Sequence, residues 1–354
     1  MIHLNHASQA ILPSVSAEAA KTIYDRYAAE GSLPIPFWES LLDEARDRAA
    51  KLLGVDSSTV VFIPNTTAGV HIAMQLIPFQ DGDRVLVVGA FPALVAPWKF
   101  SGVSGVEVVF IEWSNPSTIT RHLEESLSRS NFRAVFADWV HFATGRALDL
   151  RHLGTLVHGH NALFIVDGIQ GLGVLPSPAS STDMFFAGSA KWLLGPEGIG
   201  VCYLNPNREW NPGPVGWLSA DYEGFTSVMP PRPPRSDARR LESGTRNLAG
   251  IAAFSKSLEI LLTTGDIWSR VLPLVELLIR GAHIRGLRTS LQQPESGIVG
   301  IEVPNPESVT MRLGKRGIRV SARERWIRVS PHFFNMTLEI ETFFTALDEI
   351  LNSS

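Results

Sequence analysis

Short apolar runs alternate with amphipathic stretches along the chain as far as about residue 205. Their near-continuous hydrophobicity is typical of strands that are covered on both faces in a parallel sheet. The stretches between the runs space apolar residues as a one-sided helix does. The pattern therefore predicts an α/β fold in which a mainly parallel sheet lies between helices. The expected strands are Val60–Ile63, Arg84–Val88, Glu107–Ile111, Ala134–Ala137 and Leu163–Val166, and the expected helices are Ala68–Ile77, Ala93–Phe100, Ser117–Leu127 and Leu150–His158.

The pattern changes after the loops "NPNREWNPGPVGW" and "MPPRPPRSDARR", which are rich in proline and arginine. Long helical patterns and a few short strands follow, as in a separate α+β domain. We therefore expect a large α/β domain followed by a separate α+β domain. Its expected elements are Ala249–Leu262, Ile267–Arg285, Gly297–Val303, Glu307–Arg316, Ile318–Val320, Trp326–Val329 and a last helix to Ile350.

Composition narrows the class of protein. The 354 residues are 45% hydrophobic and 19% charged with a formal net charge of −4, so no basic surface for nucleic acid or anionic membrane is expected. The single cysteine, Cys202, excludes a disulfide framework or a multi-cysteine metal site within the chain. The N-terminus lacks the pattern of a signal peptide, and no apolar run reaches the roughly 20 residues of a membrane span. We expect a cytoplasmic protein without a metal.

One lysine stands alone in the apolar, glycine-rich run "FFAGSAKWLLGPEGIGVCYL", residues 185–204. No other Lys or Arg lies between Arg151 and Arg208. Lys191 has two interpretations: its stem is buried while its ammonium reaches water, or its amine has a lowered pKa and attacks an aldehyde. The lysine by itself does not decide between them.

Asp167 supplies a second group that a pyridoxal phosphate site needs. Such a site needs a lysine for the aldehyde, an anion for the pyridinium nitrogen, donors for the phosphate and a surface against the ring. Asp167 ends the apolar run in "LFIVDGIQGLG", and a carboxylate there would keep the ring nitrogen protonated. Gln170 offers an amide to the phenolate oxygen. Alone, Asp167 is equally consistent with a turn cap after the strand.

A phosphate site is expected where "FIPNTTAGVHIA" passes from strand to helix. Free backbone N–H groups and the helix dipole favour a dianion there, and the hydroxyls of Thr66 and Thr67 add donors. A plain helix N-cap explains the same residues. The runs "GIQGLG" and "GPEGIG" do not form the G-x-G-x-x-G pattern that opens a helix in nicotinamide dinucleotide folds.

The segments "DGIQ" and "GSAKWLLGPEGIGVCYL", with Lys191 lying 24 positions after Asp167, resemble aminotransferase class V. This family of fold-type I pyridoxal phosphate enzymes includes cysteine desulfurases, isopenicillin N epimerase, kynureninase and C–S lyases. The resemblance extends over nearly the whole chain. It implies a large α/β domain over residues 18–250 with a seven-stranded, mainly parallel sheet, and a small α+β domain built from residues 1–17 and 251–354. It also implies a Schiff base between Lys191 and pyridoxal 5′-phosphate.

Four further segments match the family in order, and each implies a role for one residue. "GAFPALVAPW" places Phe91 against the cofactor ring, and "DWVHFATGRALDL" places His141 near the substrate. "LESGTRNLAG" implies that Thr245 reaches the phosphate across a homodimer interface. "WIRVSPHFFN" implies that Arg328 holds the α-carboxylate of an amino-acid substrate.

The chain departs from the family beside the lysine and at the stacking residue. Many relatives have His immediately before the lysine, where this chain has Ala190; Ser189 remains a candidate phosphate contact. Phe91 holds a ring but moves no proton, so proton transfer is expected of Lys191, with His141 assisting. A structural hydrogen-bonding role is an equal alternative for His141.

The cysteine position is the most informative departure. Cysteine desulfurases carry a nucleophilic Cys on a small-domain loop, whereas this chain has "GIRVSARERWIRVS" there. Cys202 falls in a predicted apolar strand, where a small buried core residue is the expected role. Persulfide chemistry through a protein thiol is therefore not expected.

Three segments are candidates to contact the substrate. Trp217 in "NPGPVGWLS" resembles an active-site loop of the epimerase-like branch, and Asn5 and His6 belong to an N-terminal segment expected to fold over the site. The proline-rich stretch at 230–240 is either a solvated connector or a lid that recognises an anionic substrate. Its arginines are Arg232, Arg235, Arg239 and Arg240.

The reaction stays open at this stage. After Cα deprotonation, protonation at C4′ gives transamination, protonation at Cα gives epimerisation, and loss of a β-substituent gives elimination. The missing loop cysteine favours β-elimination of the C–S lyase type, or transamination, in a biosynthetic pathway. The alternatives are an amino-acid epimerase and a non-catalytic pyridoxal phosphate-binding partner protein, which the presence of Lys191 and Arg328 disfavours.

Overall fold

A computed structural model describes residues 1–220 and 232–352. Its centre is a seven-stranded sheet in the order β2-β8-β7-β6-β5-β3-β4, parallel except for β8, which runs antiparallel to both neighbours. The strands are β2 (Val60–Ile63), β3 (Arg84–Val88), β4 (Glu107–Ile111), β5 (Ala134–Asp138), β6 (Leu163–Asp167), β7 (Met184–Gly188) and β8 (Gly200–Leu204). The predicted mainly parallel α/β fold is confirmed.

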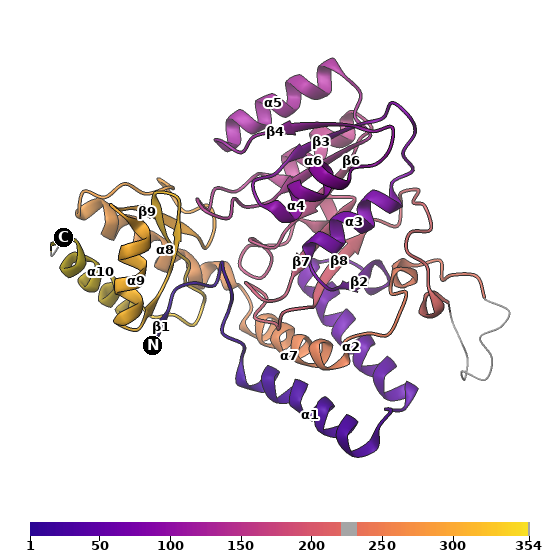
Figure 1. Cartoon of the computed structure of the whole chain (residues 1–354), viewed down its shortest axis with the longest axis horizontal. Helices are drawn as coiled ribbons and strands as arrows, with labels where there is room; N and C mark the ends of the chain where they lie inside the picture. Colours follow the sequence, from indigo (N-terminus) through magenta and orange to yellow (C-terminus); the bar gives the residue numbers. More distant parts are fainter. Residues whose placement is uncertain (221–231, 353–354) are drawn as a thin grey trace.

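Helices cover both faces of this sheet (Figure 1). Side chains of one strand alternate between the two cores: Leu86 and Val88 of β3 enter one, Val85 and Val87 the other, and none is exposed. Helices α3 (Thr66–Leu76) and α4 (Pro92–Ala96) cover one face. The opposite face is covered by α2 (Ile35–Leu53), α5 (Pro116–Arg129), α6 (Leu150–Gly159) and α7 (Leu248–Thr264).

Helix α1 (Ser14–Glu30) packs along α7, below the sheet in Figure 1. The hydrophobic pattern did not predict α1 or α2. Only Ser16 and Ile23 of α1 are fully buried, and the Ser16 hydroxyl meets that of Ser257 at 2.9 Å. A helix with so narrow a buried stripe gives a weak periodic signal.

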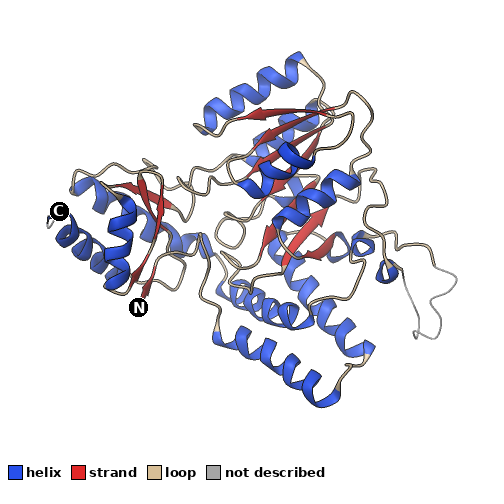
Figure 2. Ribbon diagram, viewed as in Figure 1, coloured by secondary structure: helices blue, strands red, loops and turns tan. Residues whose placement is uncertain are grey.

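The second body holds a three-stranded antiparallel sheet in the order β11-β12-β9 and a two-stranded parallel ribbon of β1 and β10 (Figure 2). Its strands are β1 (Ile2–His3), β9 (Val299–Glu302), β10 (Ile318–Arg319), β11 (Ser321–Arg323) and β12 (Trp326–Val329), and its helices are α8 (Ile267–Ile284), α9 (Pro306–Lys315) and α10 (Thr337–Asn352). Short helical turns are η1 (Ser57–Thr59), η2 (Pro97–Ser101), η3 (Ala179–Ser181), η4 (Trp217–Ser219) and η5 (Ala238–Leu241).

The two chain ends meet in this second body, and the N-terminal segment then crosses to the large sheet (Figure 1). The backbone N–H of Ala10 donates to the Ala190 carbonyl at 2.8 Å, beside the lysine. The predicted boundary after residue 250 falls inside α7, and the one after residue 17 falls inside α1. The division into domains stays a prediction. Within the described part of the chain, no helix has the length and hydrophobicity of a membrane span.

Candidate active site

The carboxyl ends of the parallel strands bring five side chains to one edge of the sheet. Phe91 follows β3, Asp138 ends β5 and Asp167 ends β6, while Lys191 follows β7 and Thr66 opens α3 just after β2. Strands of an open α/β sheet end at the same edge, where ligands of this fold class bind. The site is therefore assembled by strand order, although its members are far apart in sequence.

Asp167 has an unsatisfied oxygen in the interior. The residue is 2% exposed, and its Oδ1 accepts the Ile169 N–H at 2.9 Å, whereas Oδ2 has no hydrogen-bond partner. Burial raises the carboxyl pKa, against the lowering effects of the Ile169 N–H, Lys191 and the Thr66 hydroxyl. A buried acceptor without a donor needs one from outside the chain. The protonated ring nitrogen of pyridoxal phosphate fits this requirement.

The Lys191 amine is buried at the site and does not extend into solvent. Burial lowers its pKa to about 8; Asp167 and Asp138 act to raise it, and Arg328 and Arg323 act to lower it. Its Nζ lies 5.2 Å from the centroid of the Phe91 ring. A lysine with such a pKa is partly neutral near pH 8, and a neutral amine is the form that attacks an aldehyde.

Asp138 is a second buried carboxylate that the sequence analysis missed. It lies in register with Asp167 on the neighbouring strand, and its Oδ2 accepts the N–H groups of Ala90 at 2.8 Å and Phe91 at 3.1 Å. Burial and the nearby Asp167 charge raise its pKa. Asp138 therefore holds the backbone that carries Phe91. Its signal in the sequence was the same as that of Asp167, an Asp at the end of an apolar run.

The start of α3 has the donors expected for a phosphate. Asn65 caps the helix, since its Oδ1 accepts a hydrogen bond from the Ala68 N–H at 2.9 Å. The backbone N–H groups of Thr66 and Thr67 precede Ala68 in the first turn, where a helix has no carbonyl of its own to accept them. Thr66 is buried beside Asp167, while Thr67 is partly exposed. The cap interpretation is thus satisfied by Asn65, and the phosphate role of the two threonines stays a prediction.

Two other predicted cofactor contacts already have partners inside the protein. The Gln170 amide donates to the Ala7 carbonyl at 3.0 Å and accepts the Trp192 indole N–H at 2.9 Å, which leaves one amide hydrogen for the phenolate oxygen. The Ser189 hydroxyl, which is fully buried, donates to the Pro196 carbonyl. Both residues shape the loop around Lys191, and their contacts with the cofactor stay predictions.

Arg328 lies on β12 and is 1% exposed. Its Nη1 donates to the Phe142 carbonyl and its Nη2 to the Ser8 hydroxyl, both at 2.6 Å, and its Nε has no partner. Burial and the charge of Arg323 lower its pKa to about 9. A buried guanidinium with a free donor suits the carboxylate of an amino acid. Ser8 comes from the N-terminal segment and was missed, because nothing local links it to a residue 320 positions away.

The N-terminal segment reaches the site through Ser8 rather than through the predicted residues. The Asn5 side chain accepts the Ser321 hydroxyl at 2.7 Å, and its backbone pairs with Ser330. His6 is fully buried; its Nδ1 lies 3.0 Å from the Ser330 carbonyl, and burial lowers its pKa to about 2. The Ser321 hydroxyl also lies 3.0 Å from the Ser8 hydroxyl, so Asn5 is linked to Ser8 through Ser321. That Asn5 and His6 face the site stays a prediction.

His141 is neutral at ordinary pH. Its Nδ1 faces the backbone N–H groups of Ala143 at 3.3 Å and Thr144 at 3.1 Å, which makes Nδ1 the acceptor and Nε2 the protonated nitrogen. Burial and the Arg146 charge lower its pKa to about 4. Its ring stacks on Phe142, whose ring meets Phe91 edge-on at 5.2 Å. His141 has a structural role here, and a role in proton transfer stays a prediction.

Trp217 and Thr245 lie together, but the structure does not bring them to Lys191. Both are exposed and line a cavity of about 190 Å³ with Tyr27 and Trp38. Such exposure is expected of residues that contact the neighbouring subunit of a dimer. The sequence analysis assigned Trp217 to the substrate and Thr245 to the phosphate across a homodimer interface, and both roles stay predictions.

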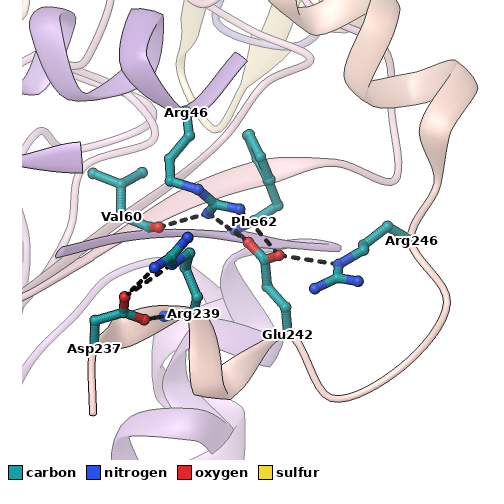
Figure 3. A network of polar contacts seen from close by, with 7 residues as sticks. All are labelled: Arg46, Val60, Phe62, Asp237, Arg239, Glu242 and Arg246. Atoms are coloured by element: carbon teal, nitrogen blue, oxygen red, sulfur yellow. Dashed lines mark hydrogen bonds and ion pairs between the residues drawn. The ribbon is translucent and has the colours of Figure 1, made fainter. Parts of the chain in front are cut away.

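A buried ion-pair network fixes the segment that carries Thr245 (Figure 3). Glu242 accepts Arg46 Nη1 at 2.7 Å, Arg246 Nε at 3.1 Å and the backbone N–H of Phe62 at 3.2 Å. Arg46 also donates to the Val60 carbonyl at 2.8 Å. The network therefore anchors this segment to β2 and α2.

The arginine-rich stretch is only partly described, because residues 230 and 231 of the predicted lid lie outside the described residues. Arg239 binds the Asp237 carboxylate at 2.7 Å, and Arg240 donates to the Asp237 carbonyl at 3.1 Å. These bonds close the turn η5. Whether the stretch is a connector or a lid stays a prediction.

Comparison with known proteins gives the same family across the chain. A model of the family "Aminotransferase class-V" matches residues 2–337. Cysteine desulfurase CsdA of Escherichia coli strain K12 is 28% identical over 295 residues, which are 77% of this chain and 71% of that protein. Isopenicillin N epimerase of Streptomyces clavuligerus is 27% identical over 383 residues, covering 99% and 95%. The solved structure of the cystine C-S lyase C-DES with its product cysteine persulfide has a TM-score of 0.87 at 22% identity, covering 98% and 96%.

Proposed function

Because this chain belongs to the aminotransferase class-V family and is a pyridoxal phosphate-dependent enzyme, we propose that it catalyses β-elimination from a small amino acid that carries sulfur at Cβ. The desulfurase and C–S lyase relatives support chemistry at a carbon–sulfur bond. In this proposal the sulfur leaves with the product and is not passed to a cysteine of the chain.

The burial of Cys202 is the main support for the proposal. It is the only cysteine in the sequence, lies in the middle of β8 and is fully buried. Burial raises the pKa of its thiol, so the reactive thiolate is disfavoured. The hairpin of β11 and β12, where a desulfurase cysteine was sought, has none. A thiol in this state is unsuited to accept sulfur from a substrate.

Each residue at the sheet edge would bind a different part of the cofactor. When bound, pyridoxal phosphate supplies an aldehyde for an amine and a cationic ring that draws electrons from Cα. Asp167 Oδ2 would hold the ring-nitrogen proton, the first turn of α3 would hold the phosphate, and Phe91 would lie against the ring. Lys191 would provide the amine.

The same amine would then move the proton. Arg328 orients the substrate through its α-carboxylate, which places Cα near Lys191 Nζ. Nζ accepts the Cα proton, the Cβ–S bond breaks, and the sulfur leaves with the bonding electron pair. The neutral His141 offers its Nε2–H to that leaving group. With water as co-substrate, the products are a keto acid, ammonia and the released sulfur compound.

Transamination and epimerisation would use the same residues up to deprotonation. Epimerisation has a specific observation in its favour, the alignment of isopenicillin N epimerase over 99% of the chain. The products separate the three reactions. Elimination releases ammonia and sulfur, transamination needs a keto-acid acceptor, and epimerisation changes only configuration.

The test is a product screen with the purified holoenzyme and a panel of amino acids, including cystine, cysteine, alanine and glutamate. We expect ammonia and a keto acid in equal amounts from a sulfur-containing member, without an added keto acid. Deuterium incorporation at Cα without ammonia would favour the epimerase. Turnover only when a keto acid is added would favour transamination, and either result would overturn β-elimination.

A further inference from the structure

Two guanidinium groups converge on one hydroxyl beside Lys191. Arg328 Nη2 donates to Ser8 Oγ at 2.6 Å, and Arg323 Nη2 approaches the same oxygen at 3.4 Å. The two arginines come from adjacent strands of one hairpin, in which Ser321 pairs with Arg328 and Arg323 pairs with Trp326. The positive charges of both arginines act to lower the pKa of the Lys191 amine.

Neither arginine has a carboxylate partner among the described residues. The remaining hydrogen bonds of the pair go to the backbone carbonyls of Phe142 and Ala322, and Arg328 Nε has none. By contrast, the buried Arg46 is neutralised by Glu242 at 2.7 Å. The two like charges share one hydroxyl and repel each other, and the charge of the buried Arg328 has no anion to compensate it, which is costly. The arrangement is stable when anions from a ligand occupy it.

The two guanidiniums differ in depth. Arg328 is 1% exposed, whereas Arg323 is partly exposed and lies next to the turn of the hairpin. A ligand that fills both positions therefore has one anionic group inside and another nearer the opening. The α-carboxylate is the inner group, because it must stay close to the atoms that react at Lys191.

We propose that Arg323 is a specificity-determining residue that binds a second carboxylate, one carried on the substrate side chain. The substrate class is then an amino acid with a distal acidic group. This inference rests on the proposed function, in which Arg328 holds the α-carboxylate. It adds that the hydroxyl of Ser8 sets the spacing between the two carboxylates, because both arginines donate to it.

The test measures the binding of unreactive acids to the holoenzyme by calorimetry. The probes are succinate and glutarate, with two carboxylates, and butyrate, with one. We expect the better dicarboxylate to bind the wild type at least about tenfold more tightly than butyrate, the size of one charged hydrogen bond. In Arg323→Gln this advantage should disappear while butyrate affinity changes less than about threefold; Arg323→Lys should retain part of it, and Arg328→Gln should weaken every acid.

Arg325→Gln is the matched control. Arg325 lies in the same hairpin but is exposed, with its guanidinium 5.0 Å from the Trp326 ring centroid. Its loss removes one charge without touching the site, so the dicarboxylate preference should remain. Equal binding of mono- and dicarboxylates by the wild type, an equal loss for both in Arg323→Gln, or the same loss in Arg325→Gln would overturn the proposal. If the dicarboxylate preference depends on Arg323 but no amino acid is eliminated, the inference stands and β-elimination fails.

Discussion

Three titratable side chains, Lys191, Asp138 and Asp167, share the buried edge of the sheet. Burial raises the pKa of both carboxyl groups and lowers that of the amine. The opposite charges counteract these shifts, so the net shift of the amine is to about 8. A cluster whose members oppose one another in this way is typical of an active site, where a neutral amine and an ionised carboxylate are needed together.

Lys191→Ala should abolish covalent attachment of the cofactor. The amine is the nucleophile, so wild-type protein should show a lysine-linked absorbance band, and borohydride should fix the label to Lys191. Its pKa lies near 8, and only the neutral form reacts. Attachment to the apoprotein should therefore accelerate as the pH rises from 7 to 9. A borohydride label on another lysine would contradict the assignment.

Substitutions of Asp138 should separate its charge from its hydrogen bonds. Asp138→Ala leaves the Ala90 and Phe91 N–H groups without an acceptor and should cost about 1–3 kcal/mol in unfolding free energy. Asp138→Asn keeps an acceptor oxygen and should cost less. Because the folded pKa of Asp138 is raised, wild-type stability from this group should fall as the pH rises from about 4 towards that pKa.

The pH dependence of denaturant unfolding of the apoprotein checks this prediction. The Asn variant lacks the titrating group, so its stability should fall less over the same pH range. Cofactor affinity gives a second measurement, because Asp138 holds the backbone of Phe91. Equal stability of the Ala and Asn variants at every pH would show that the hydrogen bonds have no such role.

Cys202→Ala should leave turnover nearly unchanged. The side chain is fully buried in β8, and its truncation should cost only about 1 kcal/mol in stability. Arg328→Ala, assayed on the same amino acid, should raise KM strongly because the carboxylate loses its charged partner. An inactive Cys202→Ala protein that still holds its cofactor would require a persulfide route.

At the scale of elements, the Glu242 network joins β2, α2 and the segment before α7 (Figure 3). Burial alone would raise the pKa of Glu242, but Arg46 and Arg246 lower it overall. The charges of Arg46 and Glu242 are almost completely removed from water, with side-chain exposures of 5% and 1%. Removing one partner of such a pair leaves the other charge uncompensated.

Glu242→Ala should destabilise the fold by about 3–5 kcal/mol, because the Arg46 guanidinium stays buried. The control is Glu259→Ala, which breaks ion pairs of a solvent-accessible carboxylate with Lys256 and Arg48 and should cost less than about 1 kcal/mol. Since the folded pKa of Glu242 is lowered, its stabilisation is present above about pH 4.3 and is lost as the pH falls through the folded value. Denaturant unfolding between pH 5 and 3 should therefore be flatter for the variant; similar costs for both variants would contradict the role of the network.

At the scale of the whole molecule, one chain holds two groups of predicted site residues apart. Lys191, Asp167 and Arg328 meet between the large sheet and the second body, where the N-terminal segment joins them. Trp217 and Thr245 lie on a cavity beside α1 and α2. We propose that the active unit is a homodimer, in which this second group completes the site of the partner.

Thr245→Ala should weaken retention of the cofactor several-fold without lowering stability, because the residue is exposed and its hydroxyl would serve the partner. Thr263→Ala is the control, since Thr263 is an exposed threonine of α7 whose hydroxyl bonds only to carbonyls of its own helix. Sedimentation of the wild type should give a dimer at assay concentration. A strictly monomeric species with full activity would rule out a shared site.

The sequence by itself determined the fold class and the identity of the central side chains. Strand-forming runs are local patterns, and Thr66 and Asp167 were found because each stands just after such a run. Lys191 was found as the lone cation of an apolar run, and Phe91 was assigned from the family resemblance. In a parallel sheet those positions share an edge, so their proximity followed without coordinates. The single cysteine and its expected burial in an apolar strand also followed from the sequence, and the structure confirms that Cys202 is fully buried.

Only the tertiary structure decided which residues complete the site. Strand register set Asp138 against Asp167, and packing between segments 320 residues apart joined Ser8 to Arg328. The structure also places Trp217 beside Thr245 and not beside Lys191, although Trp217 was expected to contact the substrate. The physical reason is that periodicity records which side of an element is buried, whereas the partner on that side is selected by the register and packing of distant segments.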